Sequence, residues 1–227
     1  MESTGSIKHY YKDGDIIIEP YREANVGPNS YDVTLGEWYI RERPPTLEYD
    51  GRSFFNPFSE QDVQRVWGKP QLARPVFDAV PPYMDLSNFK EHHRAIVLAP
   101  HENILCHTQE FIGSQRMFAT TMKARSSWGR SFTTVCRCAG QGDVGYFNRW
   151  TMEVTNNSRY HNLVLLVGMR MAQLTFDRVA SDHVSYSDNE RKSKYQASPD
   201  IETLMEEWRP TDMLPRLYMD RELRDGT

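Results

Sequence analysis

Short runs of apolar and β-branched residues, separated by proline and glycine, constrain the fold of this chain more than any other feature of its sequence. Such runs, bounded by turn residues, are typical of short and closely spaced strands, and helical periodicity is scarce. The pattern predicts a mainly β protein, with a sandwich, jelly roll or barrel rather than alternating strands and helices. We expect strands over residues 15–20, 30–40, 95–98, 103–108, 151–155, 163–167 and 171–176.

Two segments favour short helices. Ser59 precedes an acidic first turn, which predicts a helix over 60–67, and apolar residues at helical spacing predict another over 199–208. The stretch from about 41 to 90 is rich in proline, phenylalanine and charge, so we expect an insertion between early and late strands. A charged C-terminal tail is expected from about 181. A length of 227 residues can hold one ample core, which predicts a single domain over 1–227.

Composition narrows the class of protein. Hydrophobic residues make up 39% and charged residues 26% of the chain, as in ordinary soluble proteins. A formal charge of −4 and a pI near 6.0 give no basic footprint, so we expect no nucleic-acid partner. No apolar run approaches a bilayer-spanning length and the first residues do not resemble a signal peptide. These features predict a cytoplasmic protein with no membrane partner.

The three cysteines could serve as metal ligands or as buried thiols. Cys136 and Cys138 have one residue between them, and no second C-x-x-C pair accompanies them or Cys106. Zinc nucleobase deaminases carry H-x-E followed by P-C-x-x-C, and neither motif is present. We therefore expect structural thiols and no zinc, and the odd number of cysteines favours a reducing compartment.

Chemistry-bearing residues concentrate between positions 123 and 153. Arginines and adjacent serine hydroxyls over residues 123–130 suit a phosphate chain, although a solvated loop would look the same in isolation. A glycine-rich bend follows over 139–146. Glu153 is the lone carboxylate in an apolar and β-branched strand. Such a side chain usually faces water, but in a pocket, burial would prepare it for acid–base work.

The order of these motifs resembles one family. Arg125-Ser126-Ser127-x-x-Arg130, Ala139-Gly140, Asp143-x-Gly145 and Glu153 together resemble the signature of dCTP deaminases, which are related to trimeric dUTPases. Three further segments are similar to the opening strand, a shared late segment and the nucleotide-covering tail of that family: 27–36, 168–174 and 186–195.

The resemblance implies a distorted β-barrel or jelly roll of the dUTPase-like type, assembled as a homotrimer whose active sites lie between subunits. Glu153 from a neighbouring subunit would be the general base, Ser126 would help to hold the water, and Arg130 would keep Glu153 ionised. The residues implied in substrate binding are Arg125, Ser126 and Ser127 at the triphosphate, Asp143 at the deoxyribose 3′-hydroxyl, backbone from Arg137 to Ala139 at the pyrimidine edge, and Tyr186 and Lys194 in the tail. Magnesium would enter on the triphosphate oxygens.

The function implied is deamination of dCTP to dUTP and ammonia. Ala139-Gly140 is like the members that also hydrolyse dUTP to dUMP and pyrophosphate, so a bifunctional enzyme is the first alternative. A dUTPase alone, or a non-catalytic nucleotide sensor, would share the fold and the triphosphate site. Three positions depart from the family pattern: Cys136 where histidine is frequent, Asn148 where glycine is common, and Gln196, which follows Lys194-Tyr195 sooner than the family's phosphate-binding glutamine does.

Overall fold

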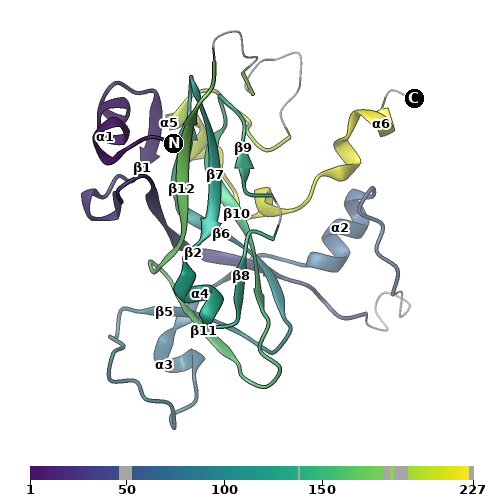
Figure 1. Ribbon diagram of the computed structural model, residues 1–227. Helices are drawn as coiled ribbons and strands as arrows, with labels where there is room; N and C mark the ends of the chain where they lie inside the picture. Colours follow the sequence, from purple (N-terminus) through teal and green to yellow (C-terminus); the bar gives the residue numbers. More distant parts are fainter. Residues whose placement is uncertain (46–52, 138, 181–184, 187–193, 225–227) are drawn as a thin grey trace.

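The computed structural model describes residues 1–45, 53–137, 139–180, 185–186 and 194–224. Figure 1 shows a tall, curled antiparallel sheet with small helical segments around it. The predicted mainly β architecture is confirmed. The strands are β1 (Ile16–Glu19), β2 (Tyr31–Arg41), β3 (Gln71–Leu72), β4 (Arg74–Pro75), β5 (Arg94–Leu98), β6 (Asn103–Ser114), β7 (Phe118–Ala124), β8 (Thr133–Val135), β9 (Gln141–Gly142), β10 (Phe147–Asn156), β11 (Leu163–Leu166) and β12 (Arg170–Arg178).

The helices are short and lie at the periphery. Ser59 caps the predicted helix α2, where its side chain accepts a hydrogen bond from the Asp62 N–H, and Asp200 caps the second predicted helix, α5. No helix in the described ranges is both long and apolar enough to cross a membrane. The helices are α1 (Thr4–Lys12), α2 (Glu60–Trp67), α3 (Val76–Ala79), α4 (Ser126–Arg130), α5 (Ile201–Glu207) and α6 (Arg221–Arg224), with 3-10 turns η1 (Glu23–Asn25), η4 (Pro210–Met213) and η5 (Leu217–Met219).

Strand β2 joins the two halves of the main sheet, whose order is β8-β10-β6-β2-β12-β7-β9. The first part of β2, Tyr31–Thr34, pairs with β12, whereas Tyr39–Arg41 pairs with β6. The register shifts between these two parts, where Gly36 lies directly against the ring of His107. A Cβ on Gly36 would lie 2.0 Å from the His107 ring, so glycine lets the sheet bend tightly here.

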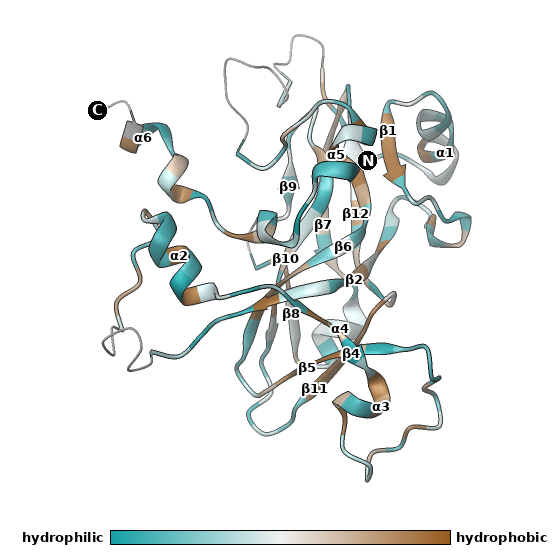
Figure 2. Cartoon of the chain, turned by 180° about the vertical axis from the view of Figure 1, so that it is seen from behind, coloured by the Kyte–Doolittle hydropathy of each residue, from teal (hydrophilic) through white to brown (hydrophobic). Residues whose placement is uncertain are grey.

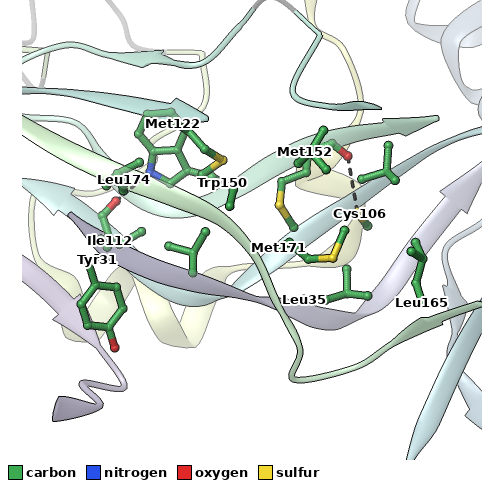
Figure 3. Close-up of a cluster of buried hydrophobic side chains, with 14 of the residues drawn as sticks. Tyr31, Leu35, Cys106, Ile112, Met122, Trp150, Met152, Leu165, Met171 and Leu174 are labelled. Carbon is green, nitrogen blue, oxygen red and sulfur yellow. Dashed lines mark hydrogen bonds between the residues drawn. The ribbon is translucent and has the colours of Figure 1, made fainter. Parts of the chain in front are cut away.

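The inner faces of this bent sheet enclose the main core. Figure 3 shows Cys106 from β6, Met152 from β10 and Met171 from β12 close together within it. The Trp150 indole Nε1–H donates to the Ile112 carbonyl at 2.8 Å, so this buried ring leaves no unpaired donor. A separate three-stranded sheet, β11-β5-β4, packs with α3 at one end of the molecule.

A smaller cluster lies on the outer face of the main sheet. Helix α2 and the C-terminal segment lie on the same side of the molecule in Figures 1 and 2. Buried side chains join them to β2 and β6, including Val63 from α2, Leu105 from β6 and Met213 from η4. Helix α2 and the C-terminal segment therefore pack together although they are far apart in the sequence, whereas α3, from the same 41–90 stretch, packs in the separate sheet.

Candidate functional site

A cleft of about 430 Å³ opens beside this outer cluster and contains four of the predicted site residues. These are Ala139, Asp143, Glu153 and Tyr186. The remaining wall combines aromatic, polar and aliphatic residues: Trp67, Leu105, Gln141, Gly142, Tyr146, Asn148, Arg149, Trp150, Thr151, Tyr195, Trp208, Asp212, Met213 and Pro215. A larger hollow of about 960 Å³ between α2 and the C-terminal segment holds none of the predicted residues.

Glu153 faces the cleft from β10. The strand alternates between buried and half-buried residues, so Glu153 shares its face with Thr151 while Met152 enters the core. Burial raises the pKa of Glu153, whereas a hydrogen bond from the Arg137 backbone N–H and the positive charge of Arg137 oppose that shift. A half-buried carboxylate with a raised pKa in a cleft is suited to accept and return a proton.

The arginine and serine cluster lies elsewhere on the chain. Ser126, Ser127 and Arg130 are exposed on the short helix α4, which follows β7. The Arg125 N–H donates to the Met171 carbonyl at 3.1 Å and the Trp128 indole N–H donates to the Arg170 carbonyl at 2.8 Å, so α4 is anchored to β12.

Arg125 itself is held by electrostatics. Its Nε lies 3.8 Å from Asp32 Oδ2, an oxygen that also receives a hydrogen bond from Arg170 at 2.8 Å. None of the four predicted α4 residues lines the Glu153 cleft of the same chain. The predicted set is therefore divided between two surfaces.

The glycine-rich bend lines one part of the cleft. Asp143 is exposed, and its carbonyl accepts a hydrogen bond from the Tyr146 N–H at 3.0 Å, which closes a turn. Gly145 has a φ of +88° and a Cβ there would meet the Ser185 hydroxyl oxygen at 2.0 Å, so this turn requires glycine. Arg137 is exposed, and its guanidinium donates to the Thr155 hydroxyl at 2.9 Å.

Tail residues cross this bend. The Tyr186 N–H donates to the Val144 carbonyl at 2.7 Å and its ring packs edge-on against Tyr146. Lys194 pairs with Asp220 and does not line the cleft. Residues 187–193, which carry part of the tail motif, lie outside the described ranges.

Two positions that depart from the family pattern hold the tail in place. The buried Gln196 amide accepts from the Phe147 N–H at 2.9 Å and donates to the Gly145 carbonyl at 3.1 Å. The Asn148 amide donates to the Tyr195 carbonyl at 2.6 Å. These side chains therefore fasten the tail to the end of β10.

The described cysteines behave as structural thiols. Cys106 is fully buried and its thiol donates to the Met152 carbonyl (Figure 3), while Cys136 is half-buried with its sulfur 3.2 Å from the Met122 sulfur. Burial raises the pKa of both thiols, that of Cys136 to about 12. Cys138 lies outside the described ranges. Within those ranges, no three His, Cys, Asp or Glu side chains are grouped as metal ligands would be.

Sequence reasoning missed part of the cleft wall. Trp67 comes from α2, Trp208 from the end of α5, and Arg149 from the same face of β10 as Glu153. The alternation of β10 indicates Arg149 once Glu153 is placed on the cleft face. No local pattern indicates the two tryptophans, because tertiary packing alone brings them to the cleft.

Comparison with known proteins identifies the family of this chain. The family model described as "dCTP deaminase-like" matches residues 1–179. The chain is 27% identical over 195 residues to "dCTP deaminase, dUMP-forming" of Methanobrevibacter smithii, covering 85% of this chain and 88% of that protein. It is 29% identical over 196 residues to "dCTP deaminase" of Natronomonas pharaonis, covering 86% and 88%.

A solved structure shows the same fold. The crystal structure of 2′-deoxycytidine 5′-triphosphate deaminase from Agrobacterium tumefaciens superposes with a TM-score of 0.53 at 16% identity. The match covers 83% of this chain and 49% of that one, so the chain spans about half the length of that protein. The family and fold class expected from the sequence motifs are confirmed, and the chain belongs to the dCTP deaminase-like family.

Proposed function

We propose that this protein hydrolyses dCTP to dUTP and ammonia, with Glu153 as the general base. The observation that carries the proposal is the position of Glu153: a half-buried carboxylate with a raised pKa that faces a cleft shared with Asp143 and Tyr186. A water molecule would give a proton to Glu153 as its oxygen bonds to C4 of cytosine. Glu153 would then pass that proton to the departing amino group, so that dCTP and water become dUTP and ammonia.

The rest of the nucleotide would be bound by two subunits of a homotrimer. Arg125, Ser126 and Ser127 would hold the triphosphate, and Arg130 would keep Glu153 of the neighbouring chain ionised. Ser126, Ser127 and Arg130 are exposed on α4, and neither they nor Arg125 line the Glu153 cleft of their own chain, which supports a site completed by a second copy.

The residues around the bend would contact the nucleoside. Asp143 would accept a hydrogen bond from the deoxyribose 3′-hydroxyl, and backbone groups from Arg137 to Ala139 would contact the pyrimidine edge. Tyr186 would pack over the bound nucleotide. Lys194 would have to exchange Asp220 for a phosphate oxygen to reach the triphosphate.

Magnesium fits this site as a companion of the triphosphate. It would neutralise charge on the phosphate oxygens, with water completing its coordination. We assign it no protein ligand, because the described residues offer no cluster of three ligating side chains.

One observation favours a second reaction at the same site. The Methanobrevibacter smithii relative is described as dUMP-forming, and this chain carries Ala139-Gly140 at the cleft. Gly140 packs so closely on the Met122 carbonyl that a Cβ would lie 2.5 Å from its oxygen, which keeps the bend narrow. Hydrolysis of dUTP to dUMP and pyrophosphate would then follow deamination.

The test is the substitution Glu153→Gln. The amide keeps the shape of the side chain but cannot accept a proton, so ammonia release from dCTP should fall by about 10²- to 10⁴-fold while dCTP binding persists. Glu91→Gln is the matched control, because Glu91 is an exposed carboxylate that does not line the cleft. Near-normal deamination by Glu153→Gln would refute the proposed role.

A second experiment, in which two inactive variants are refolded together, tests whether the active site is shared between subunits. Glu153→Gln and Arg125→Met chains, each inactive alone, should regain a fraction of wild-type activity after they are unfolded and refolded together. Mixed trimers would contain some sites with both wild-type residues. Failure to regain activity, with trimers present by light scattering, would contradict a site that combines the two residues from different chains.

A further inference from the structure

Arg149 is a cation in the cleft whose nearby negative charges, Glu37 and Glu110, act on it without a hydrogen bond or ion pair to its side chain among the described residues. Its guanidinium lies over two aromatic rings, 4.8 Å from the centroid of Phe111 and 4.6 Å from that of Trp208. Among the described residues, its side chain forms no ion pair or hydrogen bond, and its Nε is buried without an acceptor. Burial lowers the pKa of Arg149, yet an arginine remains charged at neutral pH.

The aromatic rings stabilise the charge of Arg149 but give its N–H donors no acceptor. Ring faces stabilise a guanidinium above and below its plane, but its N–H donors lie in the plane. Arginine is seldom buried without an acceptor for those donors. Contact with the two rings also limits the rotamers that the Arg149 side chain can adopt at the cleft wall.

The position of Arg149 along β10 matches the length of a nucleotide. Arg149, Thr151 and Glu153 alternate with buried residues and all line the cleft. Four residues of strand place Arg149 and Glu153 about 14 Å apart along β10. A nucleotide with its base at Glu153 could therefore direct its phosphates toward Arg149.

The charges of the cleft favour the same orientation. Among the described residues that line it, Arg149 is the only lysine or arginine, while Asp143, Glu153 and Asp212 are acidic. Asp212 is already paired with Arg216, at 2.6 Å. A polyanion that enters beside Asp143 and Glu153 still requires a compensating cation, and a guanidinium can bind two phosphate oxygens at once.

We propose that Arg149 binds a phosphate group of the nucleotide, from the same chain that supplies Glu153. The identity of the ligand rests on the proposed function, whereas the anion site rests on Arg149 and the cleft. Trp208 is then a positioning residue: the C-terminal segment holds the guanidinium against Phe111 and so helps to build the phosphate site.

The experiment compares Arg149→Met with Arg149→Lys. Calorimetry would measure binding of dCTP, deoxycytidine and inorganic tripolyphosphate, with dCTP measured in the Glu153→Gln background to prevent turnover. Arg149→Met should weaken binding of dCTP and tripolyphosphate about 10- to 100-fold, the loss expected for charged hydrogen bonds, and leave deoxycytidine binding unchanged. Arg149→Lys, which keeps the charge without the planar fork, should have an intermediate effect.

Arg178→Met is the matched control. Arg178 also lies over an aromatic ring, that of Tyr10 at 5.8 Å, but it does not line the cleft. This variant should bind all three compounds as the wild type does. If Arg149→Met does not fold, Arg149→Gln replaces it, since a planar amide can lie against the same rings without the charge.

Each outcome separates this inference from the proposed function. If wild-type and Arg149→Met chains have equal affinities for dCTP and tripolyphosphate, including no binding by either, the inference is wrong even if dCTP is deaminated. Equal losses for dCTP and deoxycytidine would also overturn it, because they would indicate a role at the base or in folding. Weaker tripolyphosphate binding by Arg149→Met, without dCTP turnover by the wild type, would keep the anion site and reject the proposed function.

Discussion

His107 should make the protein sensitive to mild acid. Its ring is 1% exposed, and burial lowers its pKa from 6.5 to about 4. Nδ1 lies 2.7 Å from the Thr108 carbonyl and acts as a donor, while Nε2 accepts from the Trp38 N–H at 3.3 Å. Protonation of Nε2 would place two N–H donors against each other in a buried site, so the folded protein strongly favours the neutral ring.

The change in the free energy of unfolding with pH follows from the difference between the pKa of His107 in the folded and unfolded states. Because the folded pKa lies below the unfolded one, the stability contributed by neutral His107 is complete above pH 6.5 and is lost as the pH falls toward 4. Between pH 7 and pH 4.5 the unfolded state binds more protons at this residue, which lowers the free energy of unfolding by about 2.4 kcal/mol.

Urea unfolding at the two pH values, at one protein concentration, measures this effect. His107→Gln keeps an acceptor for the Trp38 N–H and has no titratable group, so between pH 7 and pH 4.5 it should lose about 2.4 kcal/mol less than the wild type. The comparison cancels the titration of carboxylates, which both proteins share. Equal losses in the two proteins would refute the reasoning, whatever their absolute stabilities.

Two further predictions concern glycine and the second reaction. Gly36→Ala should lower the free energy of unfolding by about 3 kcal/mol in urea titrations, because its Cβ would overlap the buried His107 ring. Gly5→Ala in α1 is the control and should not lower the free energy of unfolding, because nothing lies within 4 Å of the new Cβ. Similar effects of the two substitutions would contradict the close approach of Gly36 to His107. If the enzyme is bifunctional, Asp143→Asn should lower the ratio of pyrophosphate to ammonia formed from dCTP, because an amide cannot act as a base near the α-phosphate. An unchanged ratio would exclude Asp143 from the hydrolysis of dUTP.

Local patterns predicted most of the sheet but not its bend. Alternation located the strands at 151–155 and 171–176, where one face is buried. Alternation predicted a strand that ends at Thr108, whereas β6 continues to Ser114. The pattern disappears there because nearly every residue of β6 is buried. Strand β7 was missed. Helix α1 was also missed, because Ile7 is its only buried residue and leaves almost no apolar periodicity.

The site was predictable as far as its motifs extend. The sequence motifs indicated Glu153, Asp143 and Tyr186, which the fold brings to one cleft. They could not indicate that Gln196 holds backbone at Phe147 and Gly145, because that contact depends on where the tail crosses β10. For the same reason Trp208 could be identified only from the tertiary structure.

The divided pairing of β2 has a consequence for the route by which the chain folds. Its N-terminal half is tied to β12, as in the Asp32–Arg170 contact 138 residues apart, and it meets β6 through Thr34 and Glu110, 76 residues apart. Contacts of such long range must overcome a large loop-closure entropy, which slows folding. Until both partners arrive, β2 exposes unpaired edges that can pair with other chains. The strand that unites the finished sheet is therefore the segment through which newly synthesised or refolding molecules are most prone to aggregate.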